Sequence, residues 1–339
     1  MNTQFFNDII QHLITAGLEK RTQQNYNAAL SDFYIFCEIY GKDPFDVSPR
    51  LVQEYICYLF KFTDVRAKGA SRRVTALGHF WKRHGHDWDR QKYPTIRAIF
   101  RGFRKLKPSQ TRPRNPFTFF HLQQAFKHIN LKTYTGLLIA STLCIGYFFG
   151  GRIGEYSPHS RDDWKSIILR RDLIFIGSPN NPKALIIDFK LHKTNKFGIY
   201  SGKVECICSC DTGICPVHII LQFTKTRDKE YGPSPNHPLL LRLNEMPIPQ
   251  YAVNHMIKNM IIKMGLDPNR YSSHSLRAGR ATDLARALKP AWFIKKWGRW
   301  RSDCWQDFYA KLDMSDIAII SKLSWHELGI ANNAILSAP

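Results

Sequence analysis

The stretch HSLRAGRATDLARALKPAWFIKKWGRWRSDCWQDFY, residues 274–309, decides the fold expected for this chain. His274 and Arg277 are three residues apart, so they share one face of a helix. Trp300 comes two residues after a glycine, and Tyr309 follows nine residues later. A histidine can move a proton, a guanidinium and an indole N–H can hold phosphate oxygens, and a tyrosine hydroxyl can act as a nucleophile. The stretch therefore predicts chemistry at a phosphate.

The net charge points to a nucleic acid as the partner. The chain has 339 residues, with 49 Lys and Arg against 27 Asp and Glu, and a formal net charge of +22. Such an excess favours a polyanion, because every phosphate contact releases counterions. Residues 61–115 alone hold 16 of the basic residues and only 3 acidic ones. We therefore expect double-stranded DNA as the partner.

No membrane-bound form is expected. No apolar run reaches the length of a bilayer span. The first residues lack the basic and apolar regions of a secretory signal, so we expect an intracellular protein, in the nucleus if the host is eukaryotic. Eight cysteines are present, and without a secretory signal a disulfide framework is not expected.

Residues 1–106 predict a domain of helices with short connections. In the last helix, which follows Pro94, apolar side chains lie on one face and arginines on another. A helix that meets only solvent can show the same pattern. Residues 107–117 contain three prolines and no helical period, which predicts a basic linker. The residues predicted to bind DNA are Arg72, Arg73, Lys82, Arg83, Arg97, Arg101, Arg104, Lys105, Lys107, Arg112 and Arg114.

Residues 118–339 predict a second domain, which is mostly helical. Leu169–Ile176 and Ala184–Lys190 have the composition of strands and are separated by a turn rich in Gly, Pro and Asn. Lys193 and Lys196 follow on the expected hairpin tip. The expected fold class is therefore mainly α with a small antiparallel sheet, an α+β fold.

A cysteine-rich segment that follows this hairpin is a candidate zinc site. Thiolate and imidazole are the ligands that zinc prefers, but the spacing differs from the CxxC pairs of zinc fingers and ribbons. Cysteines near strand ends are often inert, so zinc binding stays open, and no catalytic metal is expected. The candidate ligands are Cys206, Cys208, Cys210, Cys215 and His218.

Cleavage of a DNA strand without a metal needs a defined set of groups. Guanidinium groups stabilise the negative charge on the pentacoordinate phosphate, a histidine handles the nucleophile's proton, and a lysine protonates the leaving 5′ oxygen. The chain offers a candidate for each role. These are Arg152 and Arg277 for the guanidinium groups, His274 for the proton, Lys193 for the general acid, Trp300 for the indole donor and Tyr309 for the nucleophile, supported by Glu155, Arg299 and Lys196.

In order and spacing this set resembles the tyrosine recombinase, or phage-integrase, family. The run GRIGE, residues 151–155, looks like the family's first arginine box, and HSLR, residues 274–277, looks like its His-x-x-Arg box. Lys193 looks like the hairpin lysine of the family, with Lys196 as its competitor. Many members have Gly-His where this chain has Gly-Arg-Trp, so Arg299 competes with Trp300 for that position, and the nine-residue spacing to the tyrosine favours Trp300.

The Gly-Arg-Trp form is similar to recombinases of eukaryotic mobile elements, the Crypton and DIRS-like groups. The resemblance implies that residues 1–106 are a helical, SAM-like core-binding domain, and that residues 118–339 are the catalytic domain of a tyrosine recombinase. A C-terminal helix, near residues 315–323, is expected to dock on a neighbouring protomer.

The resemblance also implies the reaction. Tyr309 is expected to attack a DNA phosphate and form a 3′-phosphotyrosyl link, and a homotetramer is expected to exchange strands between two DNA sites. Integration or excision of a mobile element follows from such a reaction. No cofactor is needed, because the covalent link conserves the energy of the bond. Two other functions stay open, namely relaxation of DNA by a type IB topoisomerase-like enzyme and DNA binding without cleavage.

Overall fold

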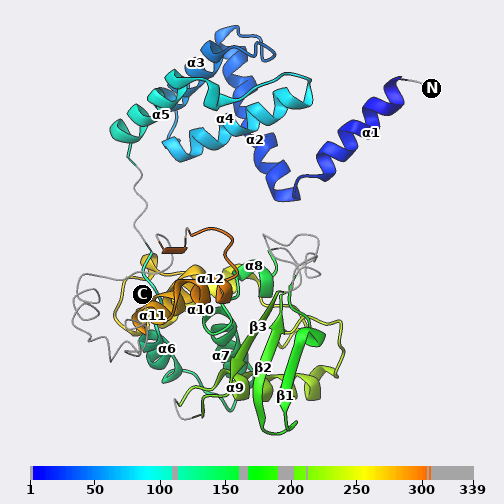
Figure 1. Ribbon diagram of the computed structural model, residues 1–339, viewed down its shortest axis with the longest axis vertical. Coiled ribbons are helices and arrows are strands. Elements are labelled where there is room, and N and C mark those ends of the chain that lie inside the picture. Colours follow the sequence, from blue (N-terminus) through cyan, green and yellow to red (C-terminus); the bar gives the residue numbers. More distant parts are fainter. Residues whose placement is uncertain are drawn as a thin grey trace, which may run out of the picture. The chain divides into compact units, whose positions relative to one another are not determined.

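The computed structural model describes residues 3–108, 114–159, 167–189, 202–210, 213–303 and 305–306. The chain forms two compact units, Met1–Thr111 and Arg112–Pro339 (Figure 1). Within the described residues, no helix is both long enough and apolar enough to span a lipid bilayer.

The first unit consists of helices joined by short connections. Ser48 begins the third helix, because its hydroxyl accepts a hydrogen bond from the Leu51 amide and proline occupies the first helical position. Aromatic and aliphatic side chains, among them Phe33, Tyr55 and Trp81, fill the core between the helices. The elements are α1 (Thr3–Ala16), α2 (Lys20–Tyr40), α3 (Pro49–Phe62), α4 (Ala67–Arg83), the short 3-10 turn η1 (Arg90–Lys92) and α5 (Pro94–Leu106).

The second unit surrounds one helix, α7, that is buried from Gly136 onward except for the half-buried Ile139. This helix is apolar on all sides, which is the pattern of a helix inside a core rather than at a surface. It packs against α9 on one side and α11 on another. The elements are α6 (Phe119–Phe126), α7 (Tyr134–Tyr147), α8 (Ile153–Tyr156), η2 (Arg170–Asp172), β1 (Leu173–Gly177), β2 (Pro182–Asp188), β3 (Lys203–Ile207), α9 (Pro216–Tyr231), α10 (Gln250–Lys263), η4 (Pro268–Arg270), α11 (Ser273–Arg286) and α12 (Ala291–Trp297).

The three strands form one antiparallel sheet in the order β1-β2-β3. Leu185 and Ile187 of β2 and Val204 of β3 are buried and belong to the core that also contains α7. The fold class predicted from the sequence, mainly α with a small antiparallel sheet, is confirmed. The first strand starts later than predicted, because η2 precedes it and Leu169 forms only an isolated bridge, to Pro238.

The end of the segment predicted as a linker lies against the second unit. The Asn115 amide donates to the Arg270 carbonyl, and the Phe117 amide donates to the Ser275 carbonyl, at 2.8 Å each. Gly279 permits this approach, since a Cβ at that position would lie 1.8 Å from the Phe117 carbonyl oxygen. Residues 114–117 are therefore held along the N-terminal half of α11.

Candidate active site

A buried carboxylate, Glu155, binds two arginines. It follows the turn at the end of α7, where Arg152 precedes the short helix α8. The backbone amide and Nη1 of Arg152 donate to its two oxygens at 2.7 and 2.8 Å. Nη2 of Arg299, which comes from the chain after α12, donates to the Glu155 Oε2 atom at 2.8 Å. The pair predicted at 152 and 155 is therefore present, and a second guanidinium shares the same carboxylate.

Burial and charge oppose each other at Glu155, which is 4% exposed. Burial alone raises the pKa of its carboxyl group, but Arg299 and Arg152 outweigh burial and hold the pKa below its ordinary value. The Glu155 side chain is therefore an anion at neutral pH. It fixes two cations whose mutual repulsion would otherwise drive them apart.

Arg277 brings a third guanidinium to the same place from α11. Its Nη1 donates to the Gly150 carbonyl at 2.5 Å, and its Nη2 donates to the Gly298 carbonyl. The Gly150 carbonyl also accepts from Arg299 Nη2 at 3.0 Å. The Arg277 guanidinium lies over the Trp300 ring, 4.4 Å from its centroid. Three guanidinium groups from three separate segments thus meet around one carboxylate and two carbonyl oxygens, and we call them the arginine cluster.

The structure places both Arg299 and Trp300 at the arginine cluster, although the sequence made them alternatives. Arg299 has a φ of +52°, the left-handed region that a non-glycine residue adopts at a cost of about 1–2 kcal/mol. This conformation reverses the chain after α12. Arg299 turns inward to Glu155 and lies 4.0 Å above the Phe189 ring, while Trp300 covers Arg277.

His274 lies in the first turn of α11, three residues before Arg277, and its side chain is exposed. The start of this helix is fixed by a reciprocal cap. The Ser275 amide donates to the Ser272 carbonyl at 2.8 Å, and the Ser272 amide donates to Ser275 Oγ at 3.1 Å. Arg114 adds a bond from Nη1 to Ser272 Oγ at 2.8 Å. The N-terminus of a helix attracts anions, so His274 stands where a phosphate is favoured.

Lys193, Lys196, Tyr309 and Arg112 lie outside the described residues. Both lysines belong to the segment 190–201, and the described residues that flank this segment lie beside the arginine cluster. The Phe189 ring packs under Arg299, and the Phe189 amide donates to the Gly202 carbonyl at 3.2 Å. At the other end of the site, the described chain stops three residues before Tyr309, where the Trp305 ring stacks on Trp300 at 6.1 Å between centroids.

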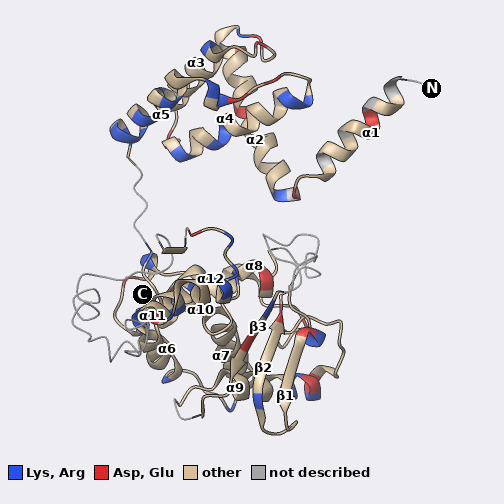
Figure 2. Ribbon diagram, in the orientation of Figure 1, with Lys and Arg blue, Asp and Glu red and all other residues tan. Residues whose placement is uncertain are grey.

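The first unit has a basic groove of about 950 Å³ between α4, η1 and α5. Figure 2 shows Lys and Arg residues along α4 and α5. Four of its cationic side chains, Arg97, Arg101, Arg104 and Lys107, were predicted to bind DNA. The sequence patterns missed Arg66, Lys68 and Arg90 of the same groove. Arg66 precedes α4 and Arg90 begins the short η1, where no helical period marks a face, and Lys68 lies in the first turn of α4.

The other predicted cations of this unit do not line the groove. Arg73 binds Asp32 of α2 at 2.7 Å and joins two helices. Arg72, Lys82 and Lys105 are exposed, and Arg83 is half-buried.

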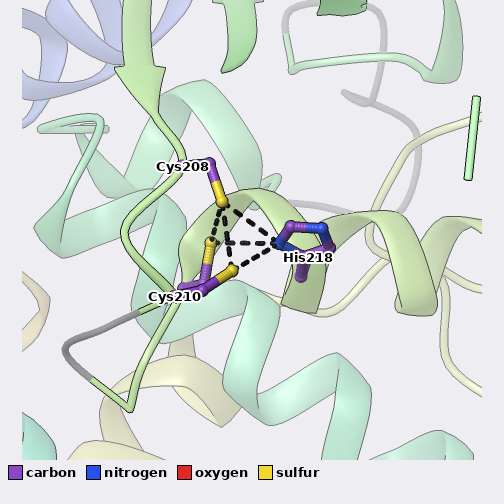
Figure 3. Close-up of side chains that lie close together, drawn as sticks. Cys208, Cys210 and His218 are labelled. Carbon is purple, nitrogen blue, oxygen red and sulfur yellow. Dashed lines mark hydrogen bonds between the residues drawn. The ribbon is translucent and has the colours of Figure 1, made fainter. Parts of the chain in front are cut away.

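Four of the five candidate zinc ligands gather in the second unit (Figure 3). The Sγ atoms of Cys208, Cys210 and Cys215 and the Nδ1 atom of His218 all lie within 4.8 Å of one another. Burial raises the pKa of the Cys215 thiol, but hydrogen bonds, first among them one from the His218 backbone amide, lower it to about 7. Cys206 is not part of the group; it lies within β3, whereas the other three cysteines follow that strand.

Comparison with known proteins shows similarity in fold rather than in sequence. No protein-family model matches the chain, and no curated protein matches it. The fold is similar to that of the XerH site-specific recombinase in a post-cleavage complex with a palindromic difH substrate. The TM-score is 0.62 and the sequence identity 12%, over 90% of this chain and 80% of that one.

Two further structures have the same fold. The Tn1549 transposon integrase in complex with circular intermediate DNA has a TM-score of 0.52 and 13% identity, over 94% of this chain and 99% of that one. A lambda integrase dimer bound to a COC′ core site has a TM-score of 0.51 and 13% identity, over 92% of this chain and 99% of that one. The chain therefore has the tyrosine recombinase fold.

Proposed function

We propose that this protein is a site-specific DNA recombinase that cleaves and rejoins DNA through a tyrosine. The observation that carries the proposal is the arginine cluster, since a site that gathers three cations around one anion is suited to a phosphate. The solved proteins with this fold include recombinases and integrases that are bound to DNA. The basic groove of the first unit supplies a second surface for the duplex backbone.

The chemistry assigned to the site is a transfer of a phosphoryl group from DNA to tyrosine and back. The Tyr309 oxygen forms a bond to phosphorus, and the bond from phosphorus to the 5′ oxygen breaks, which leaves a 3′-phosphotyrosyl link. Lys193 gives a proton to the leaving 5′ oxygen, and His274 handles the proton of the tyrosine. The 5′ hydroxyl of a partner strand then reverses the step. Bond energy is conserved, so no cofactor enters.

The three arginines differ in their access to a phosphate. The side chain of Arg152 is 19% exposed, against 8% for Arg299, and Arg277 as a whole residue is 1% exposed. We assign to Arg152 the direct contact with a non-bridging oxygen. Arg277 and Arg299 hold the cluster together and add positive potential where charge develops in the transition state.

A suicide substrate tests the proposal. Duplexes selected for binding from a library of random or element-end sequences are nicked so that the 5′ fragment escapes after cleavage, which traps the protein on DNA. The expected result is a covalent adduct with the wild-type chain and with Tyr251→Phe, an exposed tyrosine of α10 that serves as the matched control. Tyr309→Phe should give no adduct. An adduct with Tyr309→Phe contradicts the assigned nucleophile, and no adduct with any duplex supports binding without cleavage.

The two lysines and the topoisomerase alternative are separated by further assays. Lys193→Ala is expected to slow cleavage strongly and Lys196→Ala only weakly, with rescue of the first by a 5′-thio leaving group that needs no protonation. Failure of rescue removes the general-acid role. Relaxation of supercoiled DNA that needs no pair of sites would favour the topoisomerase-like function.

The active assembly in this proposal is a homotetramer on two DNA sites, of a mobile element that is integrated or excised. A groove of about 850 Å³ beside β3 and α12 has aromatic walls, with Trp292 66% exposed and Phe293 38% exposed. We assign this groove to residues 316–323 of a second copy, an apolar run that begins ten residues after Gln306. Heterologous contacts of this kind close into a ring where the rotation between neighbouring copies closes, as a tetramer requires.

Removal of the tail tests this assembly. A chain that ends at residue 314 keeps Tyr309 and is expected to bind a single DNA site but not to form tetramers in light scattering with two-site DNA. Tetramers of the shortened chain contradict this contact.

A further inference from the structure

The cysteine and histidine group of the second unit joins two separate elements. Cys208 and Cys210 follow the last residue of β3, whereas Cys215 immediately precedes α9 and His218 lies in its first turn (Figure 3). Cys208 Sγ lies 3.1 Å from Cys210 Sγ and 3.5 Å from Cys215 Sγ. His218 Nδ1 lies 3.5, 3.3 and 3.3 Å from the sulfur atoms of Cys208, Cys210 and Cys215.

These distances fit four ligands of one tetrahedral zinc ion. Zinc binds thiolate sulfur at about 2.3 Å and imidazole nitrogen at about 2.0–2.1 Å, which places two sulfur ligands about 3.8 Å apart and sulfur and nitrogen about 3.6 Å apart. The measured separations are within a few tenths of an ångström of this, apart from the shorter pair Cys208 and Cys210. All three cysteines are free, and disulfide-bonded sulfur atoms would lie near 2.05 Å.

The histidine is oriented for this role by a group outside the cluster. His218 Nε2 lies 2.9 Å from the side-chain oxygen of Asn181, in the turn between β1 and β2. An amide oxygen accepts only, so Nε2 carries the proton, and the lone pair of Nδ1 points to the three sulfur atoms. A second bond of this kind, from the remote ring nitrogen to an oxygen, is the usual companion of histidine ligands of zinc.

We propose that Cys208, Cys210, Cys215 and His218 bind one structural zinc ion. The set is complete with four protein ligands, so it offers no open position for a substrate or water, which distinguishes it from a catalytic site. Three soft sulfur donors and one imidazole exclude magnesium and calcium, which prefer oxygen. The spacing Cys-x-Cys-x4-Cys-x2-His has no CxxC pair, which is why sequence patterns gave only a weak signal.

The ion binds at the end of the β2–β3 strand pair that lies opposite the segment 190–201. It ties the end of β3 to the start of α9, and through Asn181 to the β1–β2 turn. The opposite end of the same strand pair is at Phe189, under Arg299, where the segment 190–201 begins. The five residues of β3 span about 17 Å. Zinc thus fixes the direction in which the hairpin meets the arginine cluster.

The metal content of the full-length protein tests the proposal. Protein purified without chelator and reconstituted with zinc is expected to hold one ion per chain after gel filtration. Cobalt substitution should give the intense visible bands of tetrahedral coordination and a thiolate-to-cobalt charge-transfer band. Both readouts are taken without DNA, so they stand whether or not the protein cleaves DNA.

Variants identify the ligands. Cys208→Ser and His218→Ala should lose the ion and melt at a lower temperature, while Cys206→Ala, two residues from a ligand but outside the group of four, should keep one ion per chain. A folded wild-type chain without bound zinc after reconstitution overturns the proposal. So does loss of the ion in Cys206→Ala together with its retention in Cys208→Ser. Because the wild-type measurement needs no variant, misfolding of a variant cannot hide the answer.

Discussion

Replacement of Glu155 by glutamine removes the counter-charge of the arginine cluster without a change of shape. The carboxylate is 4% exposed and receives three bonds, two from Arg152 and one from Arg299. Loss of one partner of a buried ion pair costs about 3–5 kcal/mol. The amide oxygen of glutamine keeps part of the hydrogen bonding, so we expect about 3 kcal/mol. For a unit of this size that lowers the melting temperature by about 6–12 °C.

The assay is thermal unfolding followed by circular dichroism, with Glu205→Gln on β3 as the control. Glu205 is exposed, so the same substitution there should shift the melting temperature by less than about 2 °C. At pH 7 a Glu155→Gln chain that melts together with the Glu205→Gln chain refutes the stabilising role of the carboxylate.

The pH dependence provides a second check on Glu155. Its pKa in the folded chain lies below the ordinary value. Stability from the carboxylate is therefore complete above the pKa of the unfolded chain, about 4.3, and is lost as the pH falls through the folded pKa. The difference in unfolding free energy between wild type and Glu155→Gln should be largest near neutral pH and shrink below about pH 4. A difference that grows on acidification contradicts the assignment.

Two more predictions concern the connecting segment and the basic groove. Gly279→Ala places a methyl group 1.8 Å from the Phe117 carbonyl oxygen and should lower the free energy of unfolding in urea by about 3 kcal/mol. In the control Gly102→Ala on α5 the methyl group meets nothing within 4 Å, so this variant should gain about 0.5–1 kcal/mol. Equal effects of the two substitutions would contradict the close approach at Gly279. Arg101→Ala in the groove should reduce the slope of log affinity for DNA against log salt concentration, measured by fluorescence anisotropy, by about 1. Lys92 is paired with an aspartate and does not line the groove, so the control Lys92→Ala should leave the slope unchanged. Similar slopes for the two variants would mean that DNA uses another surface.

Much of the site could be predicted from spacing alone, because its parts are local. His274 and Arg277 lie one turn apart on one helix, as their separation predicts. Arg152 and Glu155 meet because three residues span the first turn of α8. The roles of these side chains in cleavage stay predictions.

Other parts depend on tertiary structure that the sequence does not mark. Arg299 enters the cluster only because its backbone takes a left-handed conformation, which sequence patterns assign to glycine or asparagine. The basic groove collects arginines from connections as well as from one helical face. Cys206 stays outside the cysteine group because it lies within β3, whereas Cys208 and Cys210 follow the end of that strand.

The attachment of residues 114–117 to α11 has a mechanical consequence. These residues are the first part of the described chain after the segment that connects the two units. They are attached to the second unit by backbone hydrogen bonds to Arg270 and Ser275 and by a side-chain hydrogen bond from Arg114 to Ser272. A pull exerted by the first unit therefore loads the start of the helix that carries His274 and Arg277, before it reaches the core.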